Sequence, residues 1–159
     1  MFKIVDWISD KLKILGAVCL VGMTFLTCAD VVSRFFNHPI FGSVELVGFM
    51  ATLTVALALP YTHSVRGHIG VEMVVRLFSR RTRAVIELCT STASVILFSL
   101  VTWRMALYAR TMKASGEVSM NLEFPEYVII ALVAFCFLVF VLTIVRDVLA
   151  NIEILRGRR

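Results

Sequence analysis

The stretch YVIIALVAFCFLVFVLTIV, residues 127–145, is a run of 19 residues without a charged side chain. A helix needs about 20 mostly apolar residues to cross the roughly 30 Å hydrocarbon layer of a bilayer. The run is continuously apolar and does not alternate as the strands of a membrane β-barrel do. It therefore predicts a transmembrane helix, which satisfies its own backbone hydrogen bonds in lipid.

Three further segments have the same character and a similar length, each with one acidic residue near an end: 14–32, 44–61 and 84–103. The whole chain of 159 residues is 59% hydrophobic and 17% charged, with a mean hydropathy of +0.89. Soluble domains average about 45–50% apolar and 25% charged residues. We therefore predict an all-α integral membrane protein, a single membrane domain over residues 1–159 with four transmembrane helices.

The basic residues predict the orientation of these helices. Twelve of the 16 Lys and Arg residues lie in the N-terminal segment, the connection between spans two and three, and the C-terminal segment. Because basic residues favour the cytoplasmic side of a membrane, both termini are expected to be cytoplasmic. The excess of basic residues on the cytoplasmic side then explains the net charge of +5, and no nucleic-acid partner is expected.

Two segments outside the spans are amphipathic, residues 1–13 and 69–80. Their apolar residues recur at helical spacing and face a charged side, as in helices that lie in the lipid headgroup region. Membrane lipids are the expected partner of each segment, and contact with another protein is the alternative.

Charged residues in or beside the spans are candidates for function because their burial in lipid is costly. Asp30 and Arg34 are four residues apart and therefore share a helix face, which predicts a local ion pair. Glu45 begins the second span, where water can reach it at the interface. No charged side chain lies at the middle of a span, so an ion or proton pathway through this chain alone is not indicated.

Small residues share one face of the second predicted helix, and polar residues share one face of the third. Small residues recur every four positions on the second helix, and a polar stripe runs along the third. Small residues allow helices to approach closely in lipid, and polar stripes need protein or water to face. Both faces are candidate interfaces with another subunit, and packing within the chain is an equal alternative; the residues are Gly48, Thr52 and Ala56, and Glu87, Ser91 and Ser94.

Nothing in the sequence indicates catalysis or a cofactor. The three histidines, His38, His63 and His68, lie outside the expected spans, whereas haem ligation in a bundle needs histidines on facing helices. All four cysteines lie within the spans, where they are expected to act as small apolar packing residues. We expect no metal site, no cofactor and no enzymatic activity.

The order of several short motifs resembles a known family. Residues 30–37 read DVVSRFFN, a short loop leads to Glu45, and RGHIGVE at 66–72 precedes the basic run RRTR at 80–83. Together with the length and the four spans, this order resembles the small membrane subunit, of the DctQ type, of tripartite ATP-independent periplasmic (TRAP) transporters. Gly70 stands where the family often has a bulkier residue, and Glu72 keeps the acidic character of a position that is often Asp. His68 and Glu72, with Asp30 and Glu45, are expected to be structural polar residues.

The resemblance implies a bacterial inner-membrane protein that takes part in sodium-coupled symport of an organic acid such as a dicarboxylate, a sugar acid or sialic acid. Sodium and substrate are expected on the large membrane subunit, which moves as an elevator. The small subunit would pack against the static scaffold of that subunit and help a periplasmic substrate-binding protein to dock.

The connection at residues 108–126 and the shorter outer loop are the expected docking surface, with candidate residues Arg34, Arg110, Lys113 and Glu117. Two other functions stay open from the sequence. One is a self-sufficient four-helix exporter that exchanges protons at Glu45 or Asp30, and the other is a membrane anchor of a respiratory complex.

Overall fold

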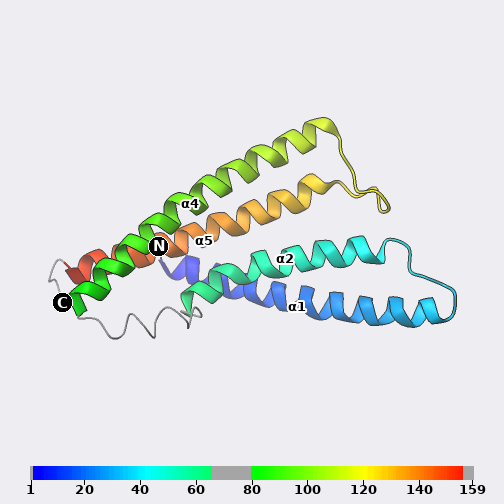
Figure 1. Ribbon diagram of the computed structural model, residues 1–159, viewed down its shortest axis with the longest axis horizontal. Helices are drawn as coiled ribbons and strands as arrows, with labels where there is room; N and C mark the ends of the chain where they lie inside the picture. Colours follow the sequence, from blue (N-terminus) through cyan, green and yellow to red (C-terminus); the bar gives the residue numbers. More distant parts are fainter. Residues whose placement is uncertain (1, 66–79, 156–159) are drawn as a thin grey trace.

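A computed structural model describes residues 2–65 and 80–155, and over these ranges the chain is built of helices without a β-strand. The four helices are α1 (Phe2–Phe35), α2 (Ser43–Ser64), α4 (Arg80–Ser115) and α5 (Glu126–Leu155) (Figure 1). Each contains a segment long and apolar enough to cross a membrane: Val5–Phe35, Ser43–Ser64, Leu88–Ser115 and Glu126–Leu149. The expected all-helical fold with four candidate spans is confirmed.

The helices are longer than the apolar runs from which they were predicted. Residues 1–13 and 14–32 were expected as an interfacial segment and a span, but α1 is continuous from Phe2 to Phe35. Residues 108–115 were expected in the connection and form the last two turns of α4. Charge ends the apolar run but not the helix, because Lys, Arg and Glu are good helix formers. The expected interfacial segment 69–80, with His68 and Glu72, lies outside the described residues except for Arg80, which begins α4.

The helices form two hairpins, α1 with α2 and α4 with α5, which are joined mainly through contacts between α2 and α5. Figure 1 shows the hairpins close together near the two chain termini and farther apart at the other end. We call these the terminal end and the loop end; the loop end carries the connections at residues 36–42 and 116–125.

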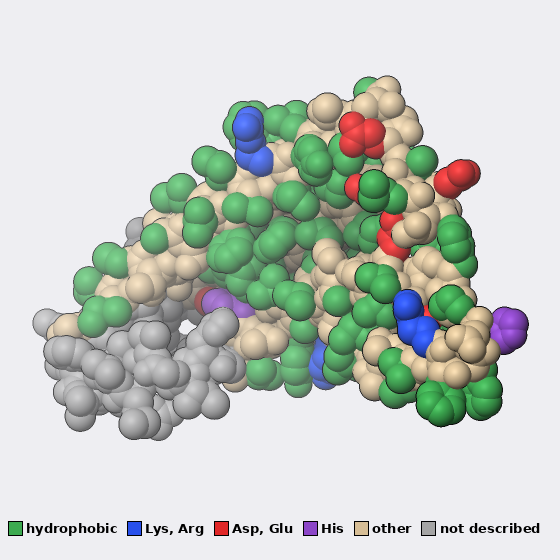
Figure 2. Space-filling model, turned by 45° about the vertical axis from the view of Figure 1, so that its right-hand side comes forward, with side chains coloured by type: hydrophobic (Ala, Val, Ile, Leu, Met, Phe, Trp, Pro, Cys, Tyr) green, Lys and Arg blue, Asp and Glu red, His purple; other side chains and the backbone are tan. Residues whose placement is uncertain are grey.

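The core lies between the two inner helices. Ala56 and Leu57 of α2 pack with Val133 and Cys136 of α5, and all four are buried. On the other side of α2, a Cβ added to Gly16 of α1 would lie 3.2 Å from Leu57 Cβ. Such close approach of helix backbones through small residues is typical of packing in membranes. The outward faces of α1 and α4 expose large apolar side chains, and Figure 2 shows extensive hydrophobic surface.

Candidate functional site

Asp30, near the end of α1, organises the first connection at the loop end. Its Oδ2 accepts a hydrogen bond from Arg34 Nε at 2.7 Å, and its Oδ1 accepts one from the backbone N–H of Ile40 at 2.9 Å. The Asp30 side chain is only 10% exposed, whereas that of Arg34 is 53% exposed. The predicted ion pair is therefore confirmed, and it also holds the loop that follows α1.

Glu45, in the first turn of α2, organises the second connection. Its carboxylate accepts the backbone N–H groups of Met120 at 3.0 Å, Asn121 at 3.3 Å and Leu122 at 2.9 Å. A carboxylate with several N–H donors forms charge-assisted hydrogen bonds, which are stronger than neutral ones. The sequence indicated only a charged residue at the interface, whereas the structure shows a contact between the two hairpins.

The second connection has a defined conformation of its own. The backbone N–H of Ser119 donates to Phe124 O at 2.9 Å, and the N–H of Phe124 donates to the Ser119 hydroxyl at 3.2 Å. Glu123 has a φ of 51°, which is uncommon for a residue other than glycine. At the tip of this loop, the side chain of Met120 is 96% exposed. The loop therefore presents an apolar side chain to its surroundings on a hydrogen-bonded frame.

The two connections touch at Gly42. This residue precedes α2 with a φ of 71°, and an added Cβ would lie 2.6 Å from Leu122 Cδ2. Only glycine suits both the left-handed conformation and the close contact. A shallow groove beside this contact is lined by Arg34, residues 39–44 and Asn121. Residues of both hairpins therefore form a single surface at the loop end.

The four candidate docking residues all lie at the loop end, on both hairpins. Arg34 is on α1, Arg110 and Lys113 are on the last turns of α4, and Glu117 follows α4. All four are exposed. Lys113 Nζ lies 5.6 Å from the ring centre of Tyr127.

The two candidate interface stripes differ in their exposure. Gly48 and Thr52 are exposed, and a Cβ added to Gly48 would meet nothing within 4 Å, whereas Ala56 is buried in the core. Ser91 and Ser94 are half-buried, and the side chain of Glu87 lies outside the described part of the structure. The Ala56 end of the α2 stripe thus packs within the chain, and the Gly48 end is open.

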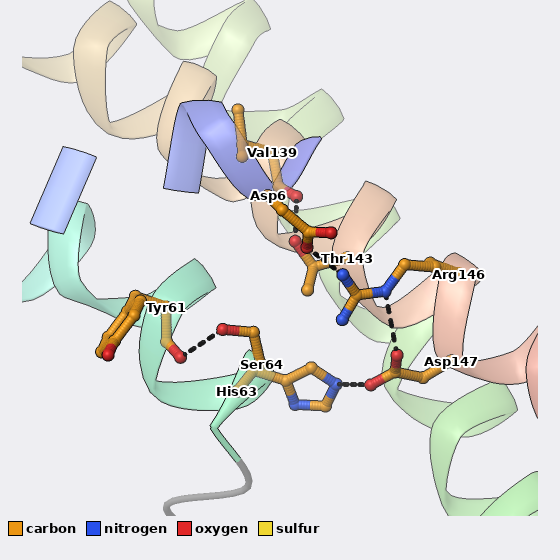
Figure 3. Close-up of polar contacts among 8 residues, drawn as sticks. All are labelled: Asp6, Tyr61, His63, Ser64, Val139, Thr143, Arg146 and Asp147. Atoms are coloured by element: carbon orange, nitrogen blue, oxygen red, sulfur yellow. Dashed lines mark hydrogen bonds and ion pairs between the residues drawn. The ribbon is translucent and has the colours of Figure 1, made fainter. Parts of the chain in front are cut away.

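A polar network at the terminal end was not predicted (Figure 3). Arg146 of α5 contacts the Asp6 carboxylate of α1 through Nη1, and its Nε donates to Asp147 at 3.2 Å. His63 Nε2 of α2 lies 3.3 Å from Asp147 Oδ2. The network links three helices. In the sequence, the members of this network have in common only that each is a charged or polar residue near the terminal end of its helix. This was the one signal that could have indicated the network.

These side chains bind one another and the backbone, in an arrangement suited to holding helices and loops. Within residues 2–65 and 80–155, no group of three or more His, Cys, Asp and Glu side chains is arranged to hold a metal ion.

Comparison with known proteins identifies the family. No match was found among curated proteins or among solved structures. A family model, "Tripartite ATP-independent periplasmic transporters, DctQ component", matches residues 23–153, which include the C-terminal part of α1, all of α2 and α4, the loop end and nearly all of α5. The chain therefore belongs to the DctQ family, the small permease component of TRAP transporters.

Proposed function

We propose that this chain scaffolds the large membrane subunit of its transporter through the exposed stripe of α2, and that its loop end helps a periplasmic substrate-binding protein to dock. The DctQ family implies both partners, a large membrane subunit and a binding protein. The observation that carries the scaffold role is the open space at Gly48 beside the exposed Thr52. A small-residue face without a neighbour in its own chain suits close contact with another helix.

Within the transporter, sodium and an organic acid such as a dicarboxylate, a sugar acid or sialic acid bind the large subunit. The charged groups of the present chain support this division, because their contacts gather at the two ends of the bundle: Asp30 and Glu45 at the loop end, and Asp6, Arg146 and Asp147 at the terminal end. The protein lies in the bacterial inner membrane with both termini in the cytoplasm, so the loop end faces the periplasm.

Photocrosslinking tests the scaffold role. A benzophenone amino acid is placed at Thr52 on α2 or at Ser91 on α4, and the chain is expressed together with the large subunit. A crosslinked heterodimer is expected from Thr52, whereas a product from Ser91 alone would place the interface on the polar stripe of α4. Phe25, which is 76% exposed on α1, is the control position, and no product is expected there. The absence of a heterodimer from both Thr52 and Ser91 would overturn the proposed interface.

Substitution of Gly48 gives a second measurement. Gly48→Leu fills the open space and is expected to lower recovery of the large subunit by about tenfold, because a close helix contact depends on the small residue. The variant subunit alone should unfold at an unchanged temperature. Val55→Leu, at a 65% exposed position of the same helix, is the control. Unchanged recovery of the large subunit with Gly48→Leu would contradict the interface.

A further inference from the structure

A groove lies along α4 near its loop end, lined by one face of the helix between Leu100 and Thr111. Arg104 occupies the middle of this face, with Leu100 and Tyr108 one turn away on either side. Arg104 is exposed and has no ion pair or hydrogen bond to another side chain within the described part of the chain. No Asp or Glu lines the groove. The groove thus offers a guanidinium group without a neighbouring counter-charge.

The groove becomes more polar along the helix axis. Only Leu100 and Val101 line the part nearer the middle of the span, whereas beyond Arg104 the lining combines the apolar Met105 and Leu107 with Tyr108, Arg110 and Thr111. Arg104 comes directly after the uncharged run that ends at residue 103. It is the first charged side chain toward the loop end of the candidate span Leu88–Ser115, a position that suits contact with lipid headgroups.

Aromatic side chains mark the same level. Trp103 is 62% exposed and Tyr108 is 50% exposed. Trp and Tyr are enriched at the membrane–water interface because one part of each ring system is apolar and the other polar. Their positions on either side of Arg104 support placing the guanidinium at the depth of the lipid phosphates.

We propose that this groove binds a phospholipid, with the phosphate on the Arg104 guanidinium and an acyl chain along Leu100 and Val101. The planar guanidinium can donate two parallel hydrogen bonds to a phosphate, which gives the contact geometry as well as charge. Only apolar residues line the groove on the acyl-chain side of Arg104, and its other polar lining residues lie on the headgroup side. The groove shares Arg110 with the proposed docking surface, but Arg104, Leu100 and Val101 belong to neither proposed interface, so the lipid contact does not depend on those interfaces.

Native mass spectrometry of the full chain, purified in detergent and titrated with phosphatidylglycerol, tests the site. Arg104→Gln is expected to lower lipid occupancy by about tenfold through loss of the paired charge-assisted hydrogen bonds. Leu100→Trp, which fills the apolar part without a change of charge, is expected to lower it similarly. Lys113→Gln is the matched control, because it removes the same charge from the same end of α4 but does not line the groove.

Three further measurements distinguish the occupants. Diacylglycerol, which lacks the phosphate, should bind the unmodified chain no better than phosphatidylglycerol binds Arg104→Gln. Inorganic phosphate at millimolar concentration should leave the bound lipid in place, and its displacement would indicate a site for the free ion. A photocrosslink from position 104 to the co-expressed large subunit would show that protein fills the groove.

The variants must be folded for the comparison to hold. Each is expected to unfold within a few degrees of the unmodified chain, because Arg104 and Leu100 are exposed. Arg104→Lys keeps the charge without the planar fork and should restore part of the lipid binding. Equal occupancy in Arg104→Gln and Lys113→Gln would overturn the proposal, as would displacement by phosphate or a crosslink to the large subunit.

Discussion

Glu45 and Leu122 are 77 positions apart in the chain, yet Glu45 Oε2 accepts the backbone N–H of Leu122 at 2.9 Å. Glu45 belongs to the first hairpin, and Leu122 lies in the connection of the second. Figure 1 shows the hairpins diverging toward this end, so the contact joins them where their helices are farthest apart. It fixes one loop relative to the other across the surface proposed for docking.

Glu45→Gln is expected to loosen the second connection. The variant keeps one acceptor oxygen in place of two and loses the negative charge, so the three N–H groups of residues 120–122 are held less well. Hydrogen exchange of these amides should speed up by about tenfold. Glu117→Gln removes the same charge from the same loop end and should leave the rates unchanged. Equal exchange rates in the two variants would show that the Glu45 contact does not hold the loop.

Substitution of two glycines of the first hairpin, Gly42 and Gly48, by alanine is expected to have different effects on the stability of the chain. Gly42→Ala is expected to destabilise the chain by about 1–2 kcal/mol from its left-handed backbone alone, with a further cost from the 2.6 Å approach to Leu122. Gly48→Ala lies within α2 with open space around the added methyl group and should be neutral or stabilising by up to about 1 kcal/mol.

Thermal unfolding in detergent measures both variants. Leu122→Ala combined with Gly42→Ala should recover the cost of the close contact but not that of the backbone conformation. Equal unfolding temperatures for Gly42→Ala and Gly48→Ala would contradict the structure at Gly42.

Local patterns predicted the four spans and the Asp30–Arg34 pair, because both depend on residues within one helix. Apolar length alone identifies a span, and a spacing of four places Asp30 beside Arg34. The contacts of Glu45 with residues 120–122 depend on how the two hairpins meet, which no local spacing reveals. The same holds for Asp6, which reaches Arg146 of α5.

The α2 stripe shows what a helical spacing pattern can predict and what it cannot. Gly48, Thr52 and Ala56 follow a spacing of four and were predicted to share one face. A helix of 3.6 residues per turn rotates such a series by about 40° at each step. Across two steps the stripe therefore turns from the exposed surface at Gly48 into the core at Ala56. The pattern identified the small residues but not the neighbour that each one meets.

Arg146→Gln is expected to destabilise the terminal end. The Arg146 side chain is 20% exposed and contacts the carboxylates of both Asp6 and Asp147. Its loss leaves two carboxylates near one another without their shared cation, at a cost of about 1–3 kcal/mol. Arg110→Gln, at an exposed position, is the control and should change stability by less than about 0.5 kcal/mol.

A double-mutant cycle with Asp6→Asn isolates the contact between α1 and α5. The two substitutions together should cost less than the sum of their separate effects, since each removes the same ion pair. Additive effects on chemical unfolding would show that Asp6 and Arg146 do not interact.

Charge at the end of α4 provides the test of docking. Arg110 and Lys113 are exposed, and Glu117, also exposed, lies four residues beyond Lys113 at the same loop end. Reversal of both basic residues, Arg110→Glu with Lys113→Glu, is expected to raise the binding-protein concentration for half-maximal uptake by about tenfold at low salt, because rim charges steer association. The maximal rate at saturating binding protein should stay the same, since these residues lie outside the proposed transport site. Recovery of the large subunit checks that assembly is intact.

The sign of the effect distinguishes docking from a general disturbance of the loop end. Glu117→Lys adds positive charge to the same surface, so the same binding protein should reach half-maximal uptake at a lower concentration. Both shifts should shrink as salt rises from 10 mM toward 1 M, where charges more than about 3 Å apart are screened. If the reversal and Glu117→Lys move the half-maximal concentration in the same direction, or if neither moves it, the charges of this surface do not guide the binding protein, and docking must use the apolar tip at Met120 or another part of the complex.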